Sequence, residues 1–211
     1  MSRDLVFYHN PMSRARIVHW MLEEVEASYE VELIRFDKNE HKAPEYLAIN
    51  PMGKLPAIVH RGTVVTESAA ICAYLADAFP DAGLAPNVRS PDRGTYYRWL
   101  FFAAGCLEPA LVDKMLDRPD PGRPSAIGYG TYRDTLDTLE QAVAKGPYLL
   151  GERFTAADLY VASQIGWGLM TKALEPRPAL VDYSTRCTER PAAKRAAARE
   201  EEFVARLKAA G

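Results

Sequence analysis

The chain has 211 residues, enough for one or two domains whose hydrophobic core needs no disulfide support. Its composition is 48% hydrophobic and 26% charged, which is typical of a soluble globular protein and excludes a disordered or fibrous one. The formal net charge of −2 gives no general attraction to nucleic acid or to an anionic membrane, so neither is expected as a partner.

The three cysteines, Cys72, Cys106 and Cys187, are far apart and lack the spacing of a zinc site or a disulfide framework. We therefore expect no metal and a reducing, cytoplasmic location. The first apolar run, Leu5–Tyr8, is too short for a signal peptide, and no segment has the length of a membrane span.

The first eighty residues alternate between strand and helix periods. Leu5–Tyr8 predicts a buried strand, and apolar residues at three- and four-residue steps predict an amphipathic helix from Ser13. Alternation over Tyr29–Leu33 predicts a second strand, followed by a polar stretch from Asp37 to Glu45 without an assigned element.

A hairpin and a helix complete this half of the chain. Residues 57–59 and 63–65 flank the turn Arg61–Gly62, and residues 68–78 return to a helical period. The order is strand, helix, strand, then strand, strand, helix, which predicts an α/β domain over residues 1–80.

The rest of the chain is predicted to be helical. Proline and glycine punctuate residues 81–93, which we assign to a linker, and residues 94–211 form a helical domain. Its predicted helices cover 96–115, 129–144, 156–173 and 191–210, and the last is interpreted as a solvated terminal helix.

The most informative motif is NPMGKLPA at residues 50–57, followed by TES at 66–68. A cis Leu55–Pro56 bond would turn the Leu55 backbone outward, where it can pair with an extended peptide. Ser68 at a helix N-terminus suits a carboxylate, and Glu67 suits an ammonium. These groups fit the γ-glutamyl end of glutathione, although an ordinary helix cap and a structural proline explain the same residues.

These motifs, with AAICAYLADAFP at 69–80, resemble the cytosolic glutathione transferases of the bacterial type. A further motif, GERFTAADL at 151–159, is similar to the start of a buried helix in that family, with Thr155 as N-cap, Asp158 at N3 and Phe154 against Leu159. The resemblance implies a thioredoxin-like N-terminal domain that binds glutathione, an all-α C-terminal domain that lines a pocket for a small hydrophobic electrophile, a role in detoxification and a homodimer.

The residue that activates the thiol has two candidates. In serine-type members, as the resemblance implies, a hydroxyl just after the first strand hydrogen-bonds the glutathione sulfur, and Ser13 fits that position. Ser13 equally fits a plain helix cap. Tyr8 is placed similarly to the activator of tyrosine-type members, but it also suits a core or pocket wall.

The remaining site residues follow from the same resemblance. His41 and Lys42 resemble positions that contact the glycine carboxylate of glutathione, and Lys54 is similarly placed, although a polar loop is often simply solvated. The predicted glutathione-binding set is His41, Lys42, Lys54, Leu55, Pro56, Glu67 and Ser68. The predicted electrophile pocket consists of Tyr8, Met12, Tyr97, Phe101 and Cys106.

Three functions compete on this scaffold: glutathione conjugation, glutathione-dependent isomerisation or dehalogenation, and ligand binding without catalysis. The paired serine of the isomerase branch is missing from Met12-Ser13-Arg14, and no cysteine lies in this loop as in the redox-active branch. These departures favour a transferase.

Overall fold

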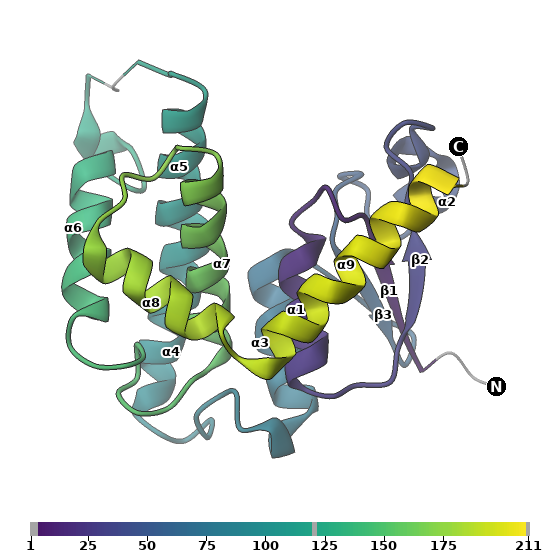
Figure 1. The fold of residues 1–211 in the computed structure, drawn as a ribbon, viewed down its shortest axis with the longest axis horizontal. Coiled ribbons are helices and arrows are strands. Elements are labelled where there is room, and N and C mark those ends of the chain that lie inside the picture. The colour runs from purple at the N-terminus through teal and green to yellow at the C-terminus, as the bar shows by residue number, and fades with distance from the viewer. Residues whose placement is uncertain (1–3, 120–121, 210–211) are drawn as a thin grey trace. The chain divides into compact units, whose positions relative to one another are not determined.

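The computed structural model describes residues 4–119 and 122–209 (Figure 1). They form two compact units, one comprising residues 4–82 with 191–209 and the other the described residues between 83 and 190. Within the described ranges, no helix combines the length and apolar character needed to cross a membrane.

The first unit is built on a four-stranded sheet of order β2-β1-β3-β4. Its strands are β1 (Leu5–His9), β2 (Glu30–Leu33), β3 (Ala57–His60) and β4 (Thr63–Thr66). β1 and β2 are parallel, while the β1–β3 and β3–β4 pairs are antiparallel. All four predicted strands are present, and the order is that of a thioredoxin-like domain.

Two helices cover this sheet. α1 (Ala15–Glu24) supplies the crossover that a parallel strand pair requires, and it packs against α3 (Ser68–Ala78). The core between helices and sheet contains Phe7, Met21 and Ile58, each with no exposed surface. α3 begins and ends at the residues predicted from its helical period, and Ser68 of the TES motif is its first residue.

The polar stretch without a predicted element contains two short helices. A 3-10 helix spans Glu40–Lys42, and α2 spans Pro44–Leu47. Asn39 adopts a left-handed conformation before the first, and Pro44 occupies the first turn of the second, where its missing N–H costs nothing. Neither helix is long enough to show a periodic apolar pattern.

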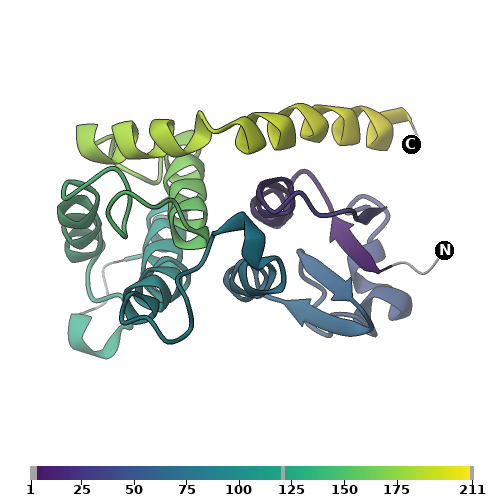
Figure 2. The ribbon, with the colours of Figure 1, turned by 90° about the horizontal axis from the view of Figure 1, so that it is seen from below.

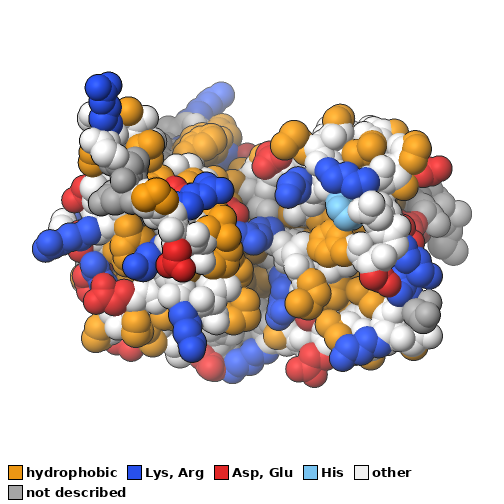
Figure 3. Space-filling view, turned by 90° about the horizontal axis from the view of Figure 1, so that it is seen from above, with side chains coloured by type: hydrophobic (Ala, Val, Ile, Leu, Met, Phe, Trp, Pro, Cys, Tyr) orange, Lys and Arg blue, Asp and Glu red, His pale blue; other side chains and the backbone are white. Residues whose placement is uncertain are grey.

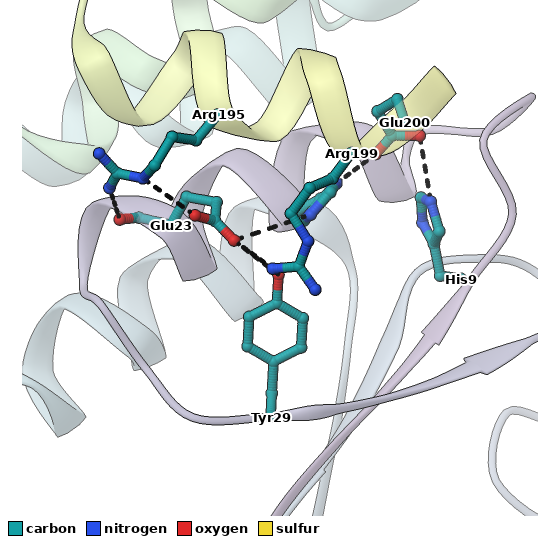
Figure 4. A network of polar contacts seen from close by, with 7 residues as sticks. His9, Glu23, Tyr29, Arg195, Arg199 and Glu200 are labelled. Carbon is teal, nitrogen blue, oxygen red and sulfur yellow. Dashed lines mark hydrogen bonds and ion pairs between the residues drawn. The ribbon is translucent and has the colours of Figure 1, made fainter. Parts of the chain in front are cut away.

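The C-terminal helix α9 (Pro191–Ala209) packs along α1 and belongs to the first unit (Figure 2). The sequence interpretation placed it in the helical domain 94–211 as a solvated helix, and the structure corrects that placement. Its buried face recurs at helical spacing and consists of Ala192, Ala193, Ala196, Glu200 and Phe203. Arg195 and Arg199 extend this contact through ion pairs to Glu23 of α1 (Figure 4).

The long secondary-structure elements of the second unit are all helices. They are α4 (Asp92–Phe102), a π-helical segment (Ala103–Leu107), α5 (Glu108–Met115), α6 (Tyr132–Val143), α7 (Ala156–Met170) and α8 (Pro178–Thr188). The predicted single helix over 96–115 starts earlier and is interrupted by the π-helical segment. α8 was missed because its buried face includes the polar residues Tyr183 and Ser184.

The start of α7 is the most deeply buried helix terminus described in this unit. Thr155 and Asp158 form the predicted capping box, in which the Thr155 N–H donates to Asp158 Oδ2 at 2.8 Å. Asp158 Oδ1 also accepts from the Leu149 N–H at 2.7 Å and the Tyr183 hydroxyl at 2.8 Å. Burial raises the pKa of the Asp158 carboxyl, and these hydrogen bonds offset only part of that effect.

We predict that Asp158→Ala lowers the free energy of unfolding by roughly 2 to 4 kcal/mol. The substitution leaves the Leu149 N–H, the Thr155 N–H and the Tyr183 hydroxyl without their acceptor. The matched control is Asp134→Ala at the exposed start of α6, where Thr131 caps the helix, and there we expect a loss of about 1 kcal/mol. Denaturant midpoints measure both. Equal losses in the two variants would show that burial adds nothing to the α7 box.

Candidate active site

The loop between β1 and α1 is organised by Asn10. Its amide Nδ2 donates to the Ile34 carbonyl at 2.7 Å, and its Oδ1 accepts from the Met12 N–H at 2.8 Å. The Ile34 N–H in turn donates to the His9 carbonyl at 2.8 Å. This side chain therefore substitutes for backbone pairing and fixes the path of the chain toward Ser13.

Ser13 lies two residues before α1. Its Oγ accepts from the Ala15 N–H at 3.1 Å and donates to the Asn10 carbonyl at 2.7 Å. The residue is half-buried. Donation to a thiolate requires the Oγ–H to turn away from Asn10, which a freely rotating hydroxyl can do.

Tyr8 lies on the opposite face of β1 from Phe7 and His9, as strand alternation requires. Its ring is 5.6 Å from that of Tyr46 in α2. The Tyr46 hydroxyl donates to the Lys54 carbonyl at 2.6 Å. Tyr8 thus packs beside the segment that supports the NPMGKLPA motif and is half-buried there.

The Asn50–Lys54 loop is held by side chains as well as backbone. Asn50 Oδ1 accepts from the Met52 N–H at 3.1 Å, and its Nδ2 donates to the Lys54 carbonyl at 2.8 Å. The Lys54 side chain is exposed. Burial raises the pKa of the Tyr46 phenol, which therefore stays a hydrogen-bond donor to this loop.

Gly53 brings this loop against the segment with His41 and Lys42. A Cβ at Gly53 would lie 2.6 Å from the His41 carbonyl oxygen and 2.7 Å from Lys42 Nζ, and the residue has φ +60°. Lys42 Nζ donates to the Met52 carbonyl at 2.9 Å. Two predicted binding segments, about ten residues apart in sequence, are therefore in direct contact.

The Leu55–Pro56 bond is cis, as predicted, and both side chains are buried. Glu67 directly precedes α3 with φ +66° and ψ 119°, a conformation that non-glycine residues seldom adopt. Its carboxylate is exposed, while Ser68 is buried at the start of the helix. Strained backbone of this kind concentrates at ligand sites.

The predicted pocket residues are divided between the two units. Met12 is 79% exposed in the first unit, and Phe101 is 70% exposed in the second, where apolar side chains reach the surface among charged ones (Figure 3). On α4, Tyr96 and Trp99 are buried in the core, whereas Tyr97 shares the exposed face with Phe101. Cys106 is half-buried, and burial raises the pKa of its thiol.

Sequence reasoning missed several supporting residues of the site. Asn10, Tyr46 and Gly53 hold the loops in place, and the Asn-Pro pairs at 10–11 and 50–51 were the available signal for the two asparagine turns. It also missed a buried cluster of His9, His19 and Glu200, whose ligand atoms lie within 4.8 Å of one another. The expectation of no metal stays a prediction.

Comparison with known proteins agrees with this geometry. Residues 4–77 match the family model of the glutathione S-transferase N-terminal domain, and residues 96–186 match that of the C-terminal domain. The chain is 32% identical over 157 residues to glutathione S-transferase GstA of Escherichia coli O157:H7, covering 73% of this chain and 77% of that protein.

Solved structures give the same result. The glutathione transferase URE2P6 of Phanerochaete chrysosporium, in complex with oxidized glutathione, has a TM-score of 0.78 and 27% identity over 96% of this chain and 98% of that one. A glutathione transferase homologue from Sulfitobacter with bound glutathione has a TM-score of 0.75 and 26% identity over 95% and 99%.

The chain therefore belongs to the glutathione S-transferase family. The predicted fold class and the general glutathione S-transferase function are confirmed, and the alternative of an isomerase, a dehalogenase or a binding module is not favoured. Glutathione is the ligand of the similar solved structures.

We predict that Gly53→Ala weakens glutathione binding, because the added methyl group would overlap the His41 carbonyl and displace Lys42. Gly62→Ala is the control, since Gly62 also has positive φ, at +79°, but no atom lies within 4 Å of its Cβ. Both variants carry a backbone strain of about 1 kcal/mol, while only Gly53→Ala should lose affinity in titration calorimetry. Equal glutathione affinities of the two variants would show that the contact of Gly53 with His41 and Lys42 is not part of the binding site.

Proposed function

We propose that the chain conjugates glutathione to a small hydrophobic electrophile, using the first unit to bind the tripeptide. The observation that carries the proposal is Glu67, an exposed carboxylate held in a strained conformation at the start of α3. Strained backbone concentrates at ligand sites, and here it sets the direction in which the exposed Glu67 carboxylate projects.

The ends of glutathione have complementary partners on this unit. Glu67 receives the α-ammonium of the γ-glutamyl residue, and the N-terminus of α3 with Ser68 receives its α-carboxylate. The backbone of Leu55, followed by Pro56, pairs with the cysteinyl peptide. Lys42, His41 and Lys54 supply positive charge or hydrogen-bond donors for the glycine carboxylate, and the Gly53 contact supports this grouping.

Ser13 is the proposed activator of the thiol. A free thiol with a pKa of about 8.5 is only a few per cent thiolate at pH 7, and each unit of lowering corresponds to about 1.4 kcal/mol of preferential stabilisation of the anion. A hydroxyl donor at the N-terminus of α1 stabilises the thiolate directly, and the helix dipole adds to it. Tyr8 is the runner-up.

In the reaction, the thiol proton leaves to solvent and the thiolate attacks an electrophilic carbon of the substrate. A carbon–sulfur bond forms, and the electron pair of the broken bond departs with a leaving group or, in an addition, moves to a neighbouring atom that is then protonated. On the second unit, Tyr97, Phe101 and Cys106 are the proposed apolar contacts of the electrophile, and on the first unit Met12 is a proposed contact next to Ser13. The proposal includes a cytoplasmic homodimer with a role in detoxification.

Ser13→Ala should lower the rate of conjugation on the order of 10²-fold and leave glutathione affinity nearly unchanged, because the hydroxyl acts on sulfur while the tripeptide is held by its ends. Turnover of an activated aryl halide with glutathione measures the rate. Tyr8→Phe is the control and should retain activity. Loss of turnover in Tyr8→Phe alone would make Tyr8 the activator.

Glu67→Ala and Ser68→Ala should have the opposite effect, each weakening glutathione binding by roughly 1 to 3 kcal/mol. Each substitution removes a hydrogen-bond partner of a charged group of glutathione, the α-ammonium for Glu67 and the α-carboxylate for Ser68. Titration calorimetry with glutathione gives the affinity, and Glu45→Ala on the exposed side of α2 is the matched control. Unchanged affinity in both variants would reduce the TES motif to an ordinary helix start.

A further inference from the structure

Glu200 connects both flanks of the loop that bears Ser13. Its Oε2 lies 3.1 Å from His9 Nε2, and its Oε1 lies 2.5 Å from His19 Nδ1 (Figure 4). His9 is the last residue of β1, and His19 lies in α1, so the two imidazoles stand on either side of the β1–α1 loop. One carboxylate from the far end of the chain therefore spans this loop.

The three side chains are sealed from solvent. His9 and His19 have no exposed surface, and Glu200 is 3% exposed. The Phe203 ring lies 5.1 Å from the His9 ring and 5.4 Å from the His19 ring, and Phe7 packs on His9 at 4.9 Å. In such apolar surroundings a hydrogen bond is strong, and a lost partner is not replaced by water.

Hydrogen bonds explain this cluster better than a metal ion. Each imidazole faces a different oxygen of one carboxylate, which is the arrangement of two donors on one acceptor group. A metal on His9 Nε2 would move the ring proton to Nδ1, which has no hydrogen-bond partner among the described residues. Metal-bound histidines normally donate that second proton to a partner.

The charge of Glu200 is stable at neutral pH. Burial by itself would raise the pKa of this carboxyl, but hydrogen bonds with His19 and His9 outweigh burial and lower its pKa to about 2. Glu200 is therefore an anion that can accept from both rings at once. Arg16, Glu23, Tyr29 and Arg199 are the other charged or titratable groups around the cluster.

We propose that Glu200 is a positioning residue for thiol activation: by binding His9 and His19 together, it holds the β1–α1 loop in the conformation that presents Ser13. The proposal rests on the proposed role of Ser13. From His9 the backbone runs through Asn10, whose carbonyl already accepts the Ser13 hydroxyl at 2.7 Å. Movement of His9 is therefore transmitted to Ser13 through a single residue.

The test is Glu200→Gln, which keeps the size of the side chain but removes the charge and one of the two acceptors. We expect the fraction of bound glutathione that is present as thiolate at neutral pH to fall about tenfold, and kcat to fall by a similar factor. KM for glutathione should stay constant, because the tripeptide ends contact other loops. Ultraviolet absorbance of the thiolate across pH and steady-state kinetics measure these quantities.

Two control variants on α9 separate this role from simple docking of the helix. Arg195→Gln removes an ion pair and a backbone contact to Glu23 but leaves His9, His19 and Glu200 themselves unchanged, and Glu202→Gln changes an exposed neighbour. Both should keep the thiolate titration of the native protein. A shift in Arg195→Gln as large as that in Glu200→Gln would overturn the proposal, since any loosening of α9 would then suffice.

The contact of Glu200 with His9 and His19 is called the clamp below. His9→Asn removes the imidazole side of the clamp and should reproduce the shift in thiolate titration expected for Glu200→Gln. An unchanged titration in both variants overturns the clamp. If Ser13→Ala shifts the titration while these two do not, the proposed function survives alone. If Ser13→Ala leaves it unchanged, Ser13 is not the activator and the proposed role of Glu200 falls with it, while conjugation with Tyr8 as activator is tested by Tyr8→Phe. A stoichiometric Zn²⁺ site in the native protein that is lost in His9→Asn would also overturn the clamp, because the cluster would be a metal centre.

Discussion

A carboxylate can be buried in a protein only where hydrogen bonds replace the water it loses, and each unit of this chain is organised around one such group. In the first unit Glu200 joins α9, α1 and β1 through two imidazoles. In the second unit Asp158 joins the start of α7 to the Leu149 backbone and to Tyr183 of α8. These hydrogen bonds require a defined geometry between donor and acceptor, whereas the apolar contacts around them have no preferred direction.

The candidate site depends on a second kind of constraint, the conformation of the backbone. Gly53 and Glu67 both have positive φ, but for different reasons. At Gly53 the surrounding atoms leave no room for a side chain, so the residue type follows from packing. At Glu67 the side chain is exposed, and the strained backbone supports the proposed role of this residue in binding a ligand.

Local sequence signals predicted the parts of the fold that depend on near neighbours. The helix at residues 68–78, the cis bond at Leu55–Pro56 and the Thr155–Asp158 box all arise from motifs of a few residues. The site residues that they contain could be proposed for the same reason. Whether Ser13 or Tyr8 acts on the thiol could not be decided, because both positions fit a hydroxyl near the first strand.

Contacts between distant residues were beyond the sequence. Glu200 lies 181 residues from His19 and 191 from His9, and its helix is so rich in alanine and charge that it resembled a solvated tail. A single buried glutamate does not alter that pattern. The same limit applied to α4, where Tyr96 is buried and Tyr97 exposed although the two are adjacent and chemically identical.

The two buried carboxylates also respond to acid in opposite directions. The pKa of Glu200 is lowered to about 2 in the folded state, so its contribution to stability is present above its unfolded pKa of 4.5 and is lost as the pH falls toward 2. Burial lowers the pKa of His9 from 6.5, so protonation of its ring also opposes folding in acid. Asp158 has a raised pKa, and its protonation at low pH relieves the cost of a buried charge. Acid therefore weakens the contact that holds α9 and the β1–α1 loop, whereas at the start of α7 it removes a charge whose burial is unfavourable.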